Sequence, residues 1–159
     1  MTDTVPLLFA FSPDLSVPRL SATTAEDVVR ALAGKLLLAG HVKPTFEAAA
    51  LLRERRSPTG LPFPGMGVAM PHAEPEHVVS PAIAIASLAV PVRFRQMGSP
   101  ATQIEVELVV MPALTSKEQA GAGLARLIEL LQDESLRIAL TAATTPDEMC
   151  AAIRARWSA

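Results

Sequence analysis

The sequence predicts an α/β protein built on a mixed β-sheet, and three observations favour that class. Apolar runs of strand length alternate with stretches in which apolar residues recur at helical spacing. The predicted order is one strand, two helices, several strands and then two or three helices, as in α/β domains. The 159 residues are 50% hydrophobic and 19% charged, which suits one substantial core and excludes intrinsic disorder as the main state. We expect a single domain over residues 1–159.

Two helices are predicted in the first third of the chain. Residues 21–24 offer N-cap side chains, and apolar residues then recur at helical spacing until Gly40, which is typical of a helix end. A second helix is predicted over Phe46–Arg53. The last third is helical, and its final helix is expected to begin at Pro146 after a threonine cap.

Strands are predicted wherever an apolar or alternating run has strand length. These runs are Val5–Phe11, Ala82–Val90, Val92–Arg95 and Ile104–Val110. Between Arg53 and His72, glycines and prolines are frequent, and we expect a long irregular loop that ends in a short apolar run.

Charge and cysteine content exclude several function classes. The 14 basic and 16 acidic residues give a net charge of −2, which argues against a nucleic-acid binder. The single cysteine excludes an internal disulfide framework and a cysteine-rich zinc site. The N-terminal residues do not resemble a signal peptide, and no apolar stretch approaches the roughly 20 residues of a membrane span. We expect a cytoplasmic protein without membrane insertion.

His72 is the strongest candidate for chemistry among the three histidines. It follows Pro71 at the end of an apolar run, and strand ends are where open α/β sheets place ligand sites. A neutral imidazole nitrogen is a nucleophile that can form a covalent intermediate. If a phosphoryl group is the electrophile, loop N–H groups, the Thr59 hydroxyl and an arginine could share its charge. From residue types alone, a functional and a purely structural His72 both remain open.

The segment after His72 contains further polar side chains, namely Glu74, Glu76 and His77. Two histidines and two glutamates so close together could bind a divalent metal, but Pro75 disrupts the helical spacing that would bring them together. Alternatively, Glu74 or Glu76 accepts a hydrogen bond from an imidazole N–H and sets its tautomer, or these are solvated loop charges. We expect no metal and no cofactor.

An ordered set of motifs resembles one protein family. The motifs are Arg53-Glu54, Pro58-Thr59-Gly60, Gly67-Val68-Ala69-Met70-Pro71-His72, Phe94-Arg95-Gln96-Met97-Gly98 and Thr145-Pro146-Asp147-Glu148. The set resembles the type-2 enzyme IIA domains of the phosphoenolpyruvate-dependent sugar phosphotransferase system. The resemblance extends from about residue 5 to residue 153, and the motif that begins at Phe94 is most similar to the galactitol-type branch.

The resemblance implies a three-layer α/β/α fold and a phosphotransferase that works through a phosphohistidine. His72 would accept a phosphoryl group from phospho-HPr through Nε2 and pass it to a cysteine of a separate IIB component. The IIC component, in the membrane, would select the sugar. Arg53 would lie near the phosphate, and Thr59 and Gly60 match the family's Thr-Gly loop.

One position departs from the mannitol-type members of that family. They carry a second active-site histidine on the helix after the fourth strand, where this sequence has Ala120 beside Gln119. We therefore expect Glu74 or His77 to support the phosphohistidine.

Two other functions remain open. The chain could be a regulatory IIA-like module that reports its phosphorylation state to other proteins. It could also be a metal-dependent hydrolase that uses His72, Glu74 and His77.

Overall fold

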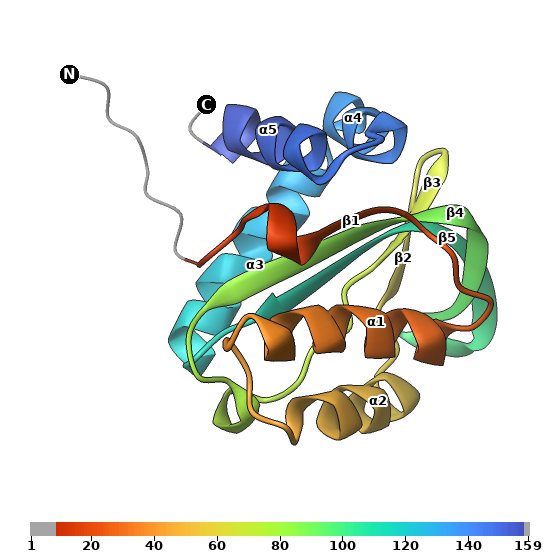
Figure 1. Cartoon of the computed structure of the whole chain (residues 1–159). Helices are drawn as coiled ribbons and strands as arrows, with labels where there is room; N and C mark the ends of the chain where they lie inside the picture. Colours follow the sequence, from red (N-terminus) through yellow and green to blue (C-terminus); the bar gives the residue numbers. More distant parts are fainter. Residues whose placement is uncertain (1–8, 158–159) are drawn as a thin grey trace.

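The computed structural model describes residues 9–157, except for the side chains at positions 119–121, 123 and 157. Within this range, five strands form one mixed sheet that helices flank, which confirms the predicted fold class (Figure 1). In chain order, the elements are β1 (Ser16–Leu20), α1 (Ala25–Leu38), α2 (Phe46–Arg56), β2 (Gly60–Phe63), β3 (Met66–Ala69), β4 (Ala82–Gln96), β5 (Ser99–Ala113), α3 (Lys117–Leu131), α4 (Glu134–Ala142) and α5 (Pro146–Trp157).

α1, α2 and α5 begin where the sequence predicts, and a threonine side chain caps the first turn of both α1 and α5. The Thr24 side chain accepts a hydrogen bond of 3.1 Å from the Asp27 amide at the start of α1. α1 packs on β4, and α2 packs on the outside of α1. On the other side of the sheet, α4 and α5 pack against β1 (Figure 1). Among the described residues, no helix is both long and apolar enough to cross a lipid bilayer.

The centre of the sheet is the long antiparallel pair of β4 and β5. β1 pairs with β4 in the parallel direction, and β3 pairs with β5 in the parallel direction. β2 is antiparallel to β3, and its first residue meets the end of β4 through the pair Gly60 and Gln96. β4 is continuous from Ala82 to Gln96, so the two strands predicted over this region are one strand with a register shift.

Of the expected first strand, Val5–Phe11, the described residues 9–11 belong to no strand of the sheet. Residues 5–8 lie outside the described residues, and Ala10 makes only an isolated bridge to Ala82. The first strand is β1, which contains Pro18 and alternates poorly, so its sequence carried little strand signal.

The predicted irregular loop is wrong over residues 60–66, because these residues and the short apolar run that follows them form the β2–β3 hairpin. Its glycines mark close strand contacts rather than loop structure. A Cβ atom at Gly67 would lie 2.0 Å from the Glu105 carbonyl oxygen, and one at Gly60 would lie 2.6 Å from the Arg95 carbonyl oxygen. Only glycine allows the hairpin to approach β4 and β5 this closely.

The parallel pairing of β3 and β5 determines which residues meet at one sheet edge. β3 ends at Ala69 and β5 ends at Ala113, and the carboxyl ends of parallel strands face the same way. The residues that follow the two strands, including His72 and Lys117, are therefore brought to the same edge.

Candidate active site

His72 is held by a hydrogen bond to its own backbone segment. Its Nδ1 atom lies 2.8 Å from the carbonyl oxygen of Met70. A carbonyl oxygen can only accept, so Nδ1 must carry the proton and donate it. In the neutral ring the lone pair then resides on Nε2, and Nε2 is the nucleophilic nitrogen.

The surroundings of His72 keep the ring neutral. Burial lowers the pKa of His72 from its ordinary value of 6.5, and the nearby Arg53 guanidinium adds to the lowering. The hydrogen bond to Met70 and the Glu74 carboxylate act on this pKa in the opposite direction. At neutral pH the ring is therefore neutral, with Nε2 free of a proton.

His72 lines a cavity of about 200 Å³ at the sheet edge. Its walls come from the end of α2, the segment after β3, the end of β5 and the start of α3. The other lining residues are Arg53, Ala73, Glu74, Pro75, Pro112, Leu114, Lys117 and Leu124. Arg53 Nε lies 3.2 Å from Glu74 Oε1, with the two side chains 33% and 56% exposed. An imidazole beside two cationic groups in a small open cavity can accept a phosphoryl group.

Sequence reasoning missed Lys117 as a residue of this cavity. Lys117 is the exposed first residue of α3, four positions after β5 ends. Its position just after a predicted strand could have marked it as a candidate, because residues at strand ends line ligand sites in α/β sheets. The sequence did not show that β3 and β5 are parallel neighbours, which is what brings Lys117 to His72.

Thr59 and Gly60 are not brought to the wall of this cavity. Thr59 is 2% exposed, and its hydroxyl lies between Glu54 and the Met70 amide. Gly60 begins β2 and packs against the Arg95 carbonyl. Both residues support the segment that carries His72, but neither faces the space where a phosphoryl group would bind.

His77 faces a neighbouring cavity of about 400 Å³. Its Nδ1 atom lies 2.8 Å from Thr45 Oγ1. Arg53 and Glu74 line both cavities, so this ion pair stands between His77 and His72. Within residues 9–157, no three His, Cys, Asp or Glu side chains are grouped so that they could hold a metal ion.

Ala120, where the resemblance to mannitol-type members places a second histidine, and its neighbour Gln119 have side chains outside the described residues. Their helix, α3, begins at Lys117 beside the His72 cavity.

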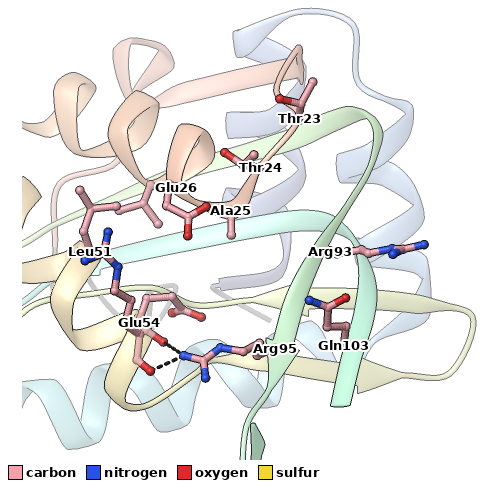
Figure 2. A pocket seen from close by; sticks show the side chains of 11 residues that line it. Thr23, Thr24, Ala25, Glu26, Leu51, Glu54, Arg93, Arg95 and Gln103 are labelled. Carbon is pink, nitrogen blue, oxygen red and sulfur yellow. Dashed lines mark hydrogen bonds between the residues drawn. The ribbon is translucent and has the colours of Figure 1, made fainter. Parts of the chain in front are cut away.

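A third cavity, of about 300 Å³, lies between α1, the end of α2, and strands β4 and β5 (Figure 2). Two of its arginines, Arg93 and Arg95, already have partners. Arg95 donates hydrogen bonds to the backbone carbonyls of Glu54 and Arg55, and Arg93 lies 3.4 Å from Glu105. Because this cavity contains no histidine or other poised nucleophile, the chemistry points to the His72 cavity as the active site.

Comparison with known proteins assigns the chain to one class, the phosphotransferases that carry phosphate on a histidine. Residues 10–155 match the family described as the phosphoenolpyruvate-dependent sugar phosphotransferase system, EIIA 2. The match covers most of the chain, so this chain belongs to that family.

Relatives within the family include a protein of known specificity and two solved structures. The chain is 32% identical over 136 residues to the 2-O-α-mannosyl-D-glycerate-specific EIIABC component of Escherichia coli K12, covering 82% of this chain but only 20% of that protein. The mannitol enzyme IIA in complex with phosphorylated mannitol enzyme IIB, from Escherichia coli, is 26% identical, with a TM-score of 0.78 over 94% of this chain and all of that one. Crystalline mannitol enzyme IIA from the same organism is 25% identical, with a TM-score of 0.74 over 91% and 99% of the two chains.

We predict that His72 titrates below the ordinary value of 6.5, because burial disfavours its cationic form. As pH falls through the lowered pKa, Nε2 takes up a proton and loses its lone pair. The rate of phosphorylation should therefore begin to fall at a lower pH than it would for a histidine of ordinary pKa. An NMR titration of ¹⁵N-labelled histidine measures the pKa directly, and the urea-unfolded chain provides the reference midpoint. A native midpoint at or above the unfolded one would contradict the prediction.

Proposed function

We propose that this chain is the phosphoryl carrier of a sugar phosphotransferase system. His72 accepts a phosphoryl group from phospho-HPr on Nε2 and passes it to a cysteine of a IIB component. The IIC component in the membrane then takes up the sugar or sugar alcohol. The observation that carries the proposal is the 2.8 Å hydrogen bond from Nδ1 of His72 to Met70, which leaves Nε2 as the nucleophile at a cavity lined by cations.

The proposed step needs little acid–base chemistry. The Nε2 lone pair forms a bond to phosphorus while the bond from phosphorus to the donor's nitrogen breaks, and that nitrogen keeps the electron pair. The accepting ring gains positive charge, and the Met70 carbonyl stabilises it through the Nδ1 proton. In the second step a thiolate of IIB attacks the same phosphorus, and Nε2 recovers its lone pair.

Two side chains of the cavity counter the charge of the phosphoryl group. A phosphoryl group carries about two negative charges at neutral pH. Arg53 and Lys117 line the cavity beside His72, and each can donate charge-assisted hydrogen bonds to phosphoryl oxygens. Glu74 orients Arg53 through their ion pair, and this is the support that we propose for Glu74. His77 faces the neighbouring cavity, and we assign it no contact with the phosphate.

The proposal also covers the extent of the domain, its location in the cell and the class of sugar. We propose one enzyme IIA domain over residues 1–159, acting in the cytoplasm on a galactitol-like sugar or sugar alcohol. The motif from Phe94 to Gly98 supports the galactitol-type assignment. The relatives named above are specific for mannosylglycerate and mannitol, and the chain spans one fifth of the mannosylglycerate protein. The sugar can be identified by mixing the phosphorylated chain with purified IIB and IIC components, adding each sugar in turn, and finding the sugar that becomes phosphorylated.

We predict that His72→Gln abolishes phosphorylation by phosphoenolpyruvate, enzyme I and HPr, because glutamine has no nucleophilic ring nitrogen. The measurement is incorporation of labelled phosphate, with mass spectrometry to locate an acid-labile adduct. His77→Gln is the matched control and should retain most of the labelling, because His77 faces another cavity.

Normal labelling of the His72 variant would refute the assignment. Labelling of the wild-type chain that no IIB component removes would instead favour the regulatory alternative.

We also predict that Arg53→Ala and Lys117→Ala each slow phosphoryl transfer by about ten- to a hundredfold, the value of one charge-assisted hydrogen bond. Both side chains are partly or fully exposed, so the fold should remain intact. Single-turnover kinetics measure the effect, and urea unfolding checks stability. Arg56→Ala, on the same helix but outside the His72 cavity, is the control. An unchanged rate would remove the altered residue from the site.

A further inference from the structure

Glu54 is a partly buried carboxylate, and the transfer step as described does not use it. It accepts two hydrogen bonds from Thr59, one of 3.0 Å from the backbone amide and one of 2.8 Å from the hydroxyl. Burial raises the pKa of Glu54 above its usual range, and the two hydrogen bonds from Thr59 oppose this effect. A carboxylate placed in such surroundings needs partners, and Thr59 supplies them.

The Thr59 hydroxyl connects this carboxylate to the active histidine. Because the hydroxyl donates its only proton to Glu54, its lone pairs are left to accept. One of them accepts a 3.1 Å hydrogen bond from the Met70 amide, and the Met70 carbonyl in turn accepts from Nδ1 of His72. The chain of contacts thus runs from Glu54 through Thr59 and Met70 to His72.

The geometry points to Glu54 and Thr59 as a positioning pair that holds Met70 so that its carbonyl keeps the Nδ1–H tautomer of His72. This inference rests on the proposed phosphoryl-carrier function and adds two residues to its machinery. Neither residue touches the phosphoryl group. Thr59 is 2% exposed and already donates its only hydroxyl proton to Glu54, which removes it from the set of phosphate ligands.

The rest of the fold fixes Glu54 in place. Arg95, from β4, donates hydrogen bonds to the backbone carbonyls of Glu54 and Arg55 at the last turn of α2 (Figure 2). These carbonyls have no partner within the helix, because α2 ends at Arg56. The end of α2 is therefore tied to the sheet at the residue whose side chain holds Thr59.

The test compares Thr59→Val with Thr59→Ser. Valine keeps the shape but removes the hydroxyl, so the Met70 amide loses its acceptor. Serine keeps both the donor and the acceptor. We expect Thr59→Val to lower the fraction of the Nδ1–H tautomer of His72 and to slow phosphorylation by about tenfold, the effect of one lost hydrogen bond. Thr59→Ser should retain both properties. The tautomer is read from the ¹⁵N shifts of the His72 ring.

Glu54→Gln provides a second test that leaves Thr59 in place. The amide can accept only one of the two hydrogen bonds from Thr59, so the tautomer should shift in the same direction as in Thr59→Val, but less. Glu47→Gln, at an exposed position in the first turn of the same helix, is the control and should change neither tautomer nor rate.

An unchanged tautomer in both Thr59→Val and Glu54→Gln would overturn the inference, even if stability or rate declined, because that result describes a purely structural role. If Thr59→Val does not fold, Glu54→Gln alone decides. The NMR measurement needs no phosphoryl donor, so it tests this inference even if the proposed carrier function fails.

Discussion

The hydrogen bond from Nδ1 of His72 to the Met70 carbonyl is the constraint on which the proposed chemistry depends. It fixes one tautomer and leaves the lone pair on Nε2. Pro71 stiffens the two-residue span between acceptor and donor, and burial lowers the pKa so that the ring stays neutral. A nucleophile prepared in this way needs no separate base, which suits a protein that both receives and releases a phosphoryl group.

Charged side chains from distant parts of the chain lie beside the His72 ring at the edge of the sheet. Arg53 comes from the end of α2, Glu74 from the segment after β3, and Lys117 from the start of α3. They meet because β3 and β5 run parallel and end at the same edge. The Gly67 contact with Glu105 permits that pairing, since a side chain at this position would separate the strands. In the proposed mechanism, the fold thus supplies both the orientation of the nucleophile and the charge that a phosphoryl group requires.

Local signals in the sequence predicted much of the fold. The sequence located the caps of α1 and α5 and the long apolar runs of β4 and β5. These features could be found because each depends only on residues that are close together in the sequence. The β2–β3 hairpin was missed because its glycines serve contacts with strands more than 30 positions away. At the candidate site, the motifs predicted roles for His72 and Arg53, which both line one cavity. The place of Lys117 at the cavity depends on the pairing of β3 with β5, and the role inferred for Glu54 depends on its hydrogen bond from Thr59. A single sequence shows neither contact.

The most direct test of the account is to find which nitrogen carries the phosphoryl group. The chain, labelled with ¹⁵N-histidine, is phosphorylated by phosphoenolpyruvate, enzyme I and HPr, and the coupling of phosphorus to nitrogen is measured by NMR. The account predicts coupling to Nε2 of His72, with the Nδ1 proton still present and bonded to Met70. Coupling to Nδ1, or to either of the other two histidines, would contradict it.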